Sequence, residues 1–204
     1  MSQASAETKR LFFAVELSDD AREAVDDIAE RLRKASVFTA CKPVWVPAQN
    51  LHVTLYFLGE VSQKVADNLV EMMPEAAAGF GHFDIDLRHL GYFPSDGREP
   101  PKVLWVGIHN PPADLGRLRA ACASLIARAG LPVPEQAFSP HITLARFKST
   151  KGLAAFRSMA KTYQFVKLGT SPVLRLTLME SVTGDGQAMY RPYSRAEFPH
   201  AAET

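Results

Sequence analysis

Two histidines in this chain each begin the same short pattern of residue types. His-Val-Thr-Leu starts at His52, and His-Ile-Thr-Leu starts at His141. Polar and apolar residues alternate in both stretches, as in a half-buried β-strand, so each histidine should share a strand face with Thr54 or Thr143, two positions on. Two imidazoles and two hydroxyls in one cleft would suit phosphate ester chemistry. One imidazole can take a proton from water while the other protonates the leaving oxygen, and the hydroxyls can bind the phosphate oxygens.

The repetition of the pattern is more informative than either copy alone. A lone histidine on a strand is usually a structural residue. With 6 histidines in the chain, two copies arising by chance have a probability below about 1%. The pair therefore predicts an acid–base site. The two motifs are nearly interchangeable, so their residues alone leave open which histidine donates the proton and which accepts it.

Other kinds of site are less well supported by the sequence. Neither motif carries a second histidine or a carboxylate at the ligand spacing of a zinc site such as His-Glu-x-x-His. Asp84 and Asp86 alternate in a strand-like stretch, which is typical of a solvated face. Cys41 and Cys122 are far apart and form no Cys-x-x-Cys pair. A glycine-rich phosphate loop is also lacking, so we expect neither a metal nor a cofactor.

Similar elements precede the two motifs. Residues 10–17 predict a strand, and a helix should follow with Ser18 as its N-cap, acidic residues in its first turn and basic residues in its last. The strand with the first motif comes next. Residues 102–109 then predict another strand, followed by a helix that Gly130 closes and by the strand with the second motif. We interpret this order as an internal duplication.

The remaining elements are predicted from the same signals. They are a helix over 62–77, a strand over 83–93, a short segment at 153–161, and two strands over 173–181 and 188–199 joined by a turn at 183–186. The sequence does not indicate which half of the molecule receives the last two strands.

Length and composition predict a soluble globular protein. The chain has 204 residues, of which 47% are hydrophobic and 22% charged, and its formal net charge is +1. No apolar run approaches the ~20 residues that a membrane span needs. The low net charge argues against wrapping of long nucleic acid, although one or two phosphates could still be bound. We expect a tail over 1–9, one domain over 10–199, a second tail over 200–204, and a cytoplasmic location.

Five stretches together resemble a known family. They are "RLFFAVEL" from residue 10, "NLHVTLYFLGEV" from 50, "KVLWVGI" from 102, "HITLAR" from 141, and the tyrosine and Phe-Pro of the last strand. In order and spacing they are similar to the bacterial and archaeal RNA 2′,3′-cyclic phosphodiesterases, formerly called 2′-5′ RNA ligases, of the two-histidine phosphoesterase superfamily. The resemblance covers about 10–199. It implies a bilobal α+β fold with a pseudo-twofold axis, two antiparallel sheets lining a central cleft, and helices outside.

The resemblance also implies an activity. The family hydrolyses a terminal RNA 2′,3′-cyclic phosphate to a 2′-phosphate without a metal, with His52 in the proton-donor role and His141 in the proton-acceptor role. Thr54 and Thr143 would bind the phosphate. The older family name adds reverse 2′-5′ ligation in vitro, driven only by equilibrium because the chain has no nucleotide-activation motif. The expected partner is an RNA 3′ end or a nucleotide with a 2′,3′-cyclic phosphate, and we expect a monomer because the cleft lies within one chain.

Arg146 is the phosphate-binding arginine that the resemblance implies. It lies five residues after His141, so strict alternation would turn it to the opposite face. A β-bulge, or an end of the strand by Ala145, would let it reach the cleft. We therefore expect one of these two irregularities in the second motif strand.

Other residues are candidates for contacts around the site. Three aromatic residues are expected to line the pocket or contact a base: Phe12, Tyr56 and Tyr190. Four cations are candidates for adding positive potential: Lys148, Lys151, Arg191 and Arg195.

Two alternatives to the main prediction stay open. A phosphodiesterase of the same superfamily could act on another substrate, such as a cyclic nucleotide, an ADP-ribose cyclic phosphate or a 2′-5′ oligonucleotide. A non-catalytic module that binds RNA ends would keep the cleft without turnover. The presence of both motifs argues against this module, because binding alone needs no second proton-transfer group.

Overall fold

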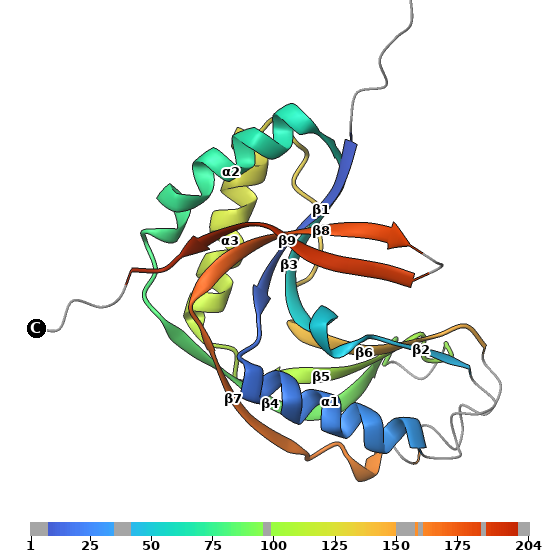
Figure 1. Ribbon diagram of the computed structural model, residues 1–204. Coiled ribbons are helices and arrows are strands. Elements are labelled where there is room, and N and C mark those ends of the chain that lie inside the picture. The colour runs from blue at the N-terminus through green and yellow to red at the C-terminus, as the bar shows by residue number, and fades with distance from the viewer. Residues whose placement is uncertain are drawn as a thin grey trace, which may run out of the picture.

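A single curled antiparallel sheet organises the chain (Figure 1). The structure is a computed structural model and describes residues 8–34, 42–95, 99–149, 158, 161–184 and 187–199. The strands are β1 (Thr8–Glu16), β2 (Pro43–Trp45), β3 (His52–Ser62), β4 (Phe83–Phe93), β5 (Val103–His109), β6 (His141–Phe147), β7 (Lys167–Val173), β8 (Arg175–Gly184) and β9 (Gln187–Glu197). The helices are α1 (Asp19–Lys34), α2 (Gln63–Ala77) and α3 (Ala113–Arg128), with the short 3₁₀ turn η2 (Ala48–Asn50).

The two motif strands meet in the middle of this sheet. The strand order is β7-β4-β5-β6-β3-β1-β8-β9, and β2 pairs with β6. The central pair is antiparallel, with Val53 of β3 opposite Ile142 of β6. On its outer side each motif strand pairs with the first strand of its own half of the chain, β1 beside β3 and β5 beside β6. The α+β class and the duplicated arrangement are confirmed, and the two expected sheets are joined into one through the central pair.

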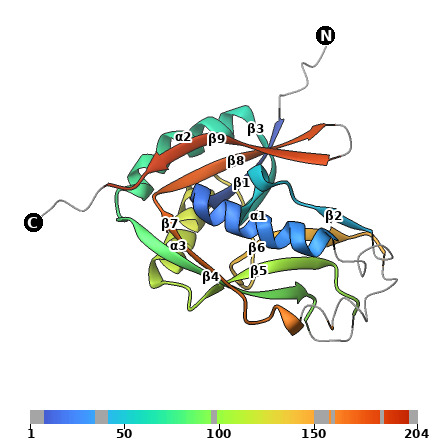
Figure 2. The same cartoon turned by 60° about the horizontal axis from the view of Figure 1, so that its bottom comes forward.

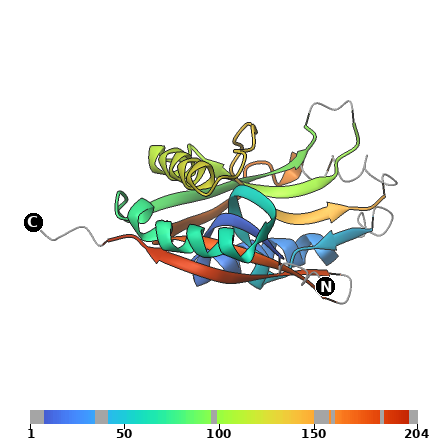
Figure 3. The same cartoon turned by 90° about the horizontal axis from the view of Figure 1, so that it is seen from above.

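The helices pack on the face of the sheet that is opposite to the motif histidines. The predicted cap of α1 is present, because the hydroxyl of Ser18 accepts the amide N–H of Ala21 at 3.3 Å. The hydroxyl of Ser62 caps α2 in the same way and accepts the Val65 N–H at 3.4 Å. Helix α1 follows β1 but packs on β7, whereas α3 follows β5 but packs on β3. Each of these two helices therefore covers the half of the sheet that did not precede it. Figures 2 and 3 show α1 and α3 as well-separated helices.

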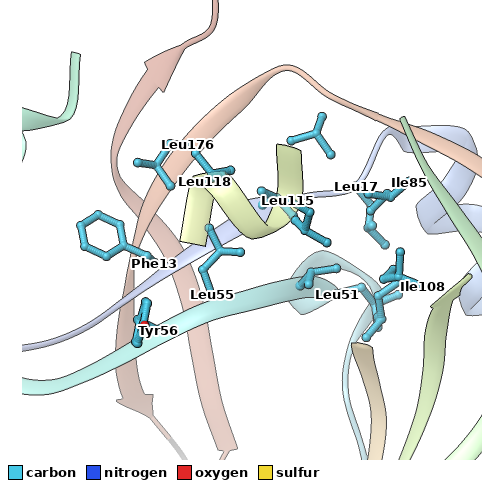
Figure 4. Close-up of a cluster of buried hydrophobic side chains, with 14 of the residues drawn as sticks. Phe13, Leu17, Leu51, Leu55, Tyr56, Ile85, Ile108, Leu115, Leu118 and Leu176 are labelled. Atoms are coloured by element: carbon cyan, nitrogen blue, oxygen red, sulfur yellow. The ribbon is translucent and has the colours of Figure 1, made fainter. Parts of the chain in front are cut away.

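The apolar residues of the motifs hold the motif strands in the core. Val53, Leu55, Ile142 and Leu144 are all buried within one cluster that includes residues of the three helices. Figure 4 shows Leu55 close to Leu115 and Leu118 of α3, with β1 alongside. Burial of one leucine or isoleucine side chain stabilises a fold by about 1.5–3 kcal/mol. The same residues that recur in the two motifs therefore fix the position of the polar residues between them.

The C-terminal part completes the first half of the sheet and adds a strand that the sequence did not predict. β8 and β9 form the predicted hairpin and extend the half that contains β3, because β8 pairs with β1. β7 was not predicted, since its Gly169 and Pro172 resemble a turn. Gly169 has a φ of +90°, and proline is tolerated because β7 is an edge strand.

Some predicted segments fall wholly or partly outside the described residues. Of the expected tail over 1–9, residues 8 and 9 belong instead to β1. The remaining residues of that tail lie outside the described part, as do the tail over 200–204, Cys41, Lys151, most of the segment 153–161, and residues 185 and 186 of the predicted turn.

Candidate active site

The two motifs place four polar side chains on one face at the centre of the sheet. When the pairing of Val53 with Ile142 is extended by one residue in each direction, each histidine falls opposite the threonine of the other motif. A pocket opens at this point. Its lining residues are Val46, Asn50, His52, Thr54, Phe57, His141, Thr143, Arg146 and Tyr190. The structure thus brings the residues of both motifs together in one pocket.

Both imidazoles are held by the same kind of hydrogen bond. The Nδ1 atom of His52 lies 2.7 Å from the carbonyl oxygen of Asn50, and the Nδ1 atom of His141 lies 2.7 Å from that of Ser139. A carbonyl can only accept, so Nδ1 carries the proton in both rings and Nε2 is left with its lone pair. The Nε2 atom of His52 is 2.9 Å from the Thr54 hydroxyl, which donates to it. Both neutral imidazoles therefore have an Nε2 atom that is ready to accept a proton.

A β-bulge occurs at the same place in each motif strand. Leu55 and Tyr56 are both buried in β3, and the pairing with β1 shifts by one residue there. Leu144 and Ala145 are likewise both buried in β6, where the pairing with β5 shifts. The extra residue returns the next side chain to the pocket face. The expected irregularity before Arg146 is therefore a bulge, and Arg146 lines the pocket.

The same bulge makes the prediction for Tyr56 wrong. Tyr56 is 7% exposed and packs in the hydrophobic core with the guanidinium of Arg119 4.4 Å from its ring (Figure 4). Phe57 takes the place on the pocket face, where it is 52% exposed. Simple alternation along the strand points to Tyr56, and nothing in the sequence marks the inserted residue, so Phe57 was missed.

The other two aromatic candidates both contact His52. The ring centroid of Phe12 is 4.9 Å from that of His52, but the side chain is only 2% exposed, so the expected contact of Phe12 with a base is wrong. Phe12 forms the floor under the imidazole. Tyr190 lines the pocket as expected, with its ring 5.3 Å from His52 in an edge contact.

His141 has its own aromatic neighbours on the other half of the sheet. The ring of Phe93 lies 5.0 Å from the imidazole in an edge contact, and that of Trp105 lies at 6.3 Å. Trp105 extends over Gly91 of the adjacent strand, where a Cβ atom would lie 2.2 Å from the indole. The missing side chain of Gly91 therefore leaves room for the Trp105 indole beside the second motif.

Burial lowers the pKa values of both histidines. The pKa of His52 falls to about 4, first because burial disfavours the charged form and then because His141 and Arg146 repel a positive charge, against the opposing effects of the Asn50 carbonyl and Glu16. The pKa of His141 is also lowered, first by burial and then by Arg146, while the Ser139 carbonyl opposes the shift. Both rings are therefore neutral at pH 7 when no anion is bound.

The described residues contain no group of three or more His, Cys, Asp or Glu side chains that could hold a metal ion. Asp86 instead forms an ion pair with Arg88 at 2.6 Å. Among the described helices, none combines the length and the apolar character that crossing a membrane requires.

The fold and this site define a phosphoesterase-like protein with two histidine motifs, and comparison with known proteins identifies the family. The family profile of the 2′-5′ RNA ligase superfamily matches residues 16–185. The chain belongs to this superfamily. The RNA 2′,3′-cyclic phosphodiesterase of Aeropyrum pernix is 35% identical over 152 residues, which are 74% of this chain and 84% of that protein. The protein of the same name from Escherichia coli is 33% identical over 141 residues, 69% of this chain and 73% of that one.

Solved structures agree with this assignment. The apo form of Escherichia coli LigT has a TM-score of 0.70 at 28% identity and covers 94% of this chain and 98% of its own. LigT has also been solved in complex with 3′-AMP, at a TM-score of 0.70 and 29% identity, covering 94% of this chain and 99% of its own. The expected fold, family and enzyme class, an RNA 2′,3′-cyclic phosphodiesterase, are thereby confirmed.

Proposed function

We propose that this protein hydrolyses the 2′,3′-cyclic phosphate at an RNA 3′ end to a 2′-phosphate, without a metal, by means of the two motif histidines. The main support is that both imidazoles line one pocket with Nδ1 tied to a carbonyl, which leaves two Nε2 atoms for proton transfer. The family membership supports the substrate class, and the chemistry of the residues supports the mechanism.

In this mechanism the two histidines act on opposite sides of the phosphorus. His141 Nε2 takes a proton from water, and the resulting hydroxide attacks phosphorus. The bond from phosphorus to O3′ breaks, and protonated His52 Nε2 gives its proton to O3′, which leaves as an alcohol. Thr54, Thr143 and Arg146 bind the non-bridging oxygens, whose charge grows in the transition state. The roles of donor and acceptor come from the family resemblance.

The low pKa of His52 limits the fraction of the free enzyme in which this proton donor is protonated. Near pKa 4, only about one His52 in a thousand is protonated at pH 7 in the free enzyme. An anionic phosphate beside Nε2 favours the charged form, so substrate binding should raise the pKa of His52. We expect a bell-shaped dependence of kcat/KM on pH, with both flanks below pH 6.5 because the pKa values of both histidines are lowered in the free enzyme. The flanks of the kcat profile should lie at higher pH, because kcat reports the enzyme with substrate bound.

The test is incubation of an RNA oligonucleotide ending in a 2′,3′-cyclic phosphate with the protein in excess chelator. Wild type should open the ring to a 2′-phosphate, and reverse 2′-5′ joining should occur only at high product concentration.

Faster turnover of a mononucleotide cyclic phosphate, an ADP-ribose cyclic phosphate or a 2′-5′ oligonucleotide would reassign the substrate. Tight RNA-end binding without turnover would indicate a binding module, and loss of activity on chelation would refute metal independence. We also propose that the protein acts as a monomer in the cytoplasm.

A further inference from the structure

We propose that Asn50 is a positioning residue that fixes His52 by two separate groups, its main-chain carbonyl and its side-chain amide. This inference rests on the proposed function for its catalytic consequence. Asn50 ends the turn η2, and only Leu51 separates it from β3. It is one of few buried polar residues in the described part of the chain, at 2% exposure. Neither motif pattern includes it, so the motifs alone do not reveal this role.

The side-chain amide of Asn50 is bonded to the edge of β9. Its Nδ2 donates to the carbonyl oxygen of Ala188 at 3.0 Å, and its Oδ1 accepts the N–H of Tyr190 at 3.1 Å. β9 is an edge strand that pairs with β8 on its other side, so these two backbone groups would otherwise lack a strand partner. The carboxamide supplies one donor and one acceptor, as a neighbouring strand would. It thereby ties the last strand of the sheet to the start of the first motif (Figure 1).

These bonds determine the surroundings of His52 on two sides. The Asn50 carbonyl oxygen holds Nδ1 at 2.7 Å, which sets the tautomer and the ring plane. The hydrogen bond from the Tyr190 N–H to Asn50 Oδ1 keeps the Tyr190 ring 5.3 Å from the imidazole. Phe12 packs 5.1 Å from the same tyrosine ring. Loss of the amide should let β9 move away and admit water beside His52. The imidazole would then be more easily protonated and less well aligned.

The test compares Asn50→Ala with Ser62→Ala. The second variant removes only the α2 cap and serves as a control for a modest loss of stability. Asn50→Ala should lower kcat about 10- to 100-fold, as expected from a small misplacement of a catalytic group, with a smaller change in KM. The His52 imidazole, followed by NMR, should titrate about one pH unit or more higher than in wild type. Ser62→Ala should leave both quantities at their wild-type values.

The NMR titration separates this inference from the proposed function, because it needs no substrate. If the Asn50→Ala imidazole titrates as in wild type, Asn50 does not position His52, whatever the enzyme hydrolyses. If Asn50→Ala does not fold, Asn50→Ser decides the matter, because its hydroxyl can keep one of the two bonds and an intermediate titration shift is expected. If the Asn50→Ser variant has lost both hydrogen bonds to β9 and its His52 imidazole still titrates as in wild type, the inference is refuted in the same way.

A different observation points to a binding subsite beside the pocket. A hollow of about 380 Å³ shares Val46, Asn50, Arg146 and Tyr190 with the pocket and adds Val44, Trp45, Pro47, Lys148 and Ala188. Its two cations are Arg146 and Lys148, and neither forms an ion pair with a carboxylate in the described part of the chain. Two other candidate cations are already paired, Arg191 with Glu180 and Arg195 with Glu16, both at 2.8 Å. Positive charge is therefore concentrated in this hollow.

The geometry points to binding of the next phosphate of an RNA strand by Lys148. Lys148 comes directly after the last residue of β6 and two positions after Arg146, and two residues of chain span at most about 7 Å, which is on the order of the spacing between consecutive phosphates in a nucleotide chain. With the cyclic phosphate at Arg146, the phosphate on the 5′ side of the terminal nucleotide would reach Lys148. The enzyme would then favour an oligonucleotide over a single nucleotide that lacks this second phosphate.

The ratio of kcat/KM for a dinucleotide and a mononucleotide, both ending in a 2′,3′-cyclic phosphate and lacking a terminal 5′-phosphate, tests this subsite. Wild type should prefer the dinucleotide, and Lys148→Met should reduce the ratio about 10-fold. The slope of log(kcat/KM) against log(salt) for the dinucleotide should become shallower by about 0.7. Lys64→Met, an exposed lysine on α2, should change neither quantity. An unchanged ratio in Lys148→Met would refute the subsite, whereas failure of wild type on both substrates would refute the proposed function.

Discussion

The two motif histidines share a backbone conformation and a hydrogen-bond pattern but differ in their surroundings. Each has Nδ1 held by the carbonyl two residues earlier, and each is followed by a bulge after the threonine. His52 is enclosed by Phe12 and Tyr190, and its pKa falls to about 4. The residue that holds His141, Ser139, is exposed. The motif therefore determines how each imidazole is oriented, whereas residues outside the motif determine how readily each is protonated.

The position after each bulge shows a second difference. It holds Phe57 in β3 and Arg146 in β6, and both side chains line the pocket. A duplicated structural position thus carries an exposed aromatic ring on one side of the pocket and a guanidinium on the other. In the proposed function this difference sets the orientation of the bound substrate, with its phosphate toward Arg146 and its ribose or base near Phe57.

The largest expected effect is the loss of either motif histidine. His52→Ala and His141→Ala should each lower kcat about 10²- to 10⁴-fold, which is the range that general acid–base groups contribute. The double variant should be little worse than either single one, because the two groups act in one step. Single-turnover assays on the cyclic-phosphate oligonucleotide measure this. His109→Ala removes an imidazole that lies outside the pocket and should retain the full rate, and full activity of either motif variant would rule out paired catalysis.

The difference in burial should also appear in folding stability at low pH. The folded-state pKa of His52 is depressed to about 4 from an ordinary value of 6.5, so the unfolded chain binds the proton more readily. This histidine contributes stability above pH 6.5 that is lost as the pH falls toward 4. The shift corresponds to about 3 kcal/mol at most. Urea unfolding of wild type and His52→Gln at pH 7 and pH 4.5 should show a smaller pH dependence in the variant, and equal dependence would contradict the buried neutral imidazole.

The two residues that come after the bulges should affect different kinetic constants. Arg146→Gln should lower kcat about 10- to 100-fold, because it removes a charged donor from the phosphate as negative charge develops. Phe57→Leu should act mainly on KM, by up to about 10-fold, since a stacking contact contributes to ground-state binding. Steady-state kinetics on one oligonucleotide substrate separate the two. If both variants changed only KM, the assignment of the phosphate to the Arg146 side would be wrong.

The sequence predicted the features that depend on period and repetition, and failed where a single inserted residue changed the outcome. The two motifs, the capped helix α1 and the C-terminal hairpin are each encoded in a local pattern. Tyr56 and Phe57 exchanged roles because the bulge in β3 depends on pairing with β1, which no window of the sequence contains. Phe12 was placed on the correct face, but its burial under His52 depends on β9. The role inferred for Asn50 likewise depends on contacts with residues about 140 positions away.

The smallest expected effect comes from the aromatic support of His141. Gly91→Ala would place a Cβ atom 2.2 Å from the Trp105 indole, which must then shift away. We expect a loss of about 1–3 kcal/mol in the free energy of unfolding, and a several-fold decrease in kcat because Trp105 lies beside His141 but not beside His52. Gly116→Ala, in the open interior of α3, is the matched control and should stabilise the fold by about 0.5–1 kcal/mol. NMR titration of both imidazoles completes the comparison: only the His141 resonance should shift in Gly91→Ala. Equal shifts at both histidines would show that the two halves of the pocket are coupled, and that their surroundings do not act on each histidine separately.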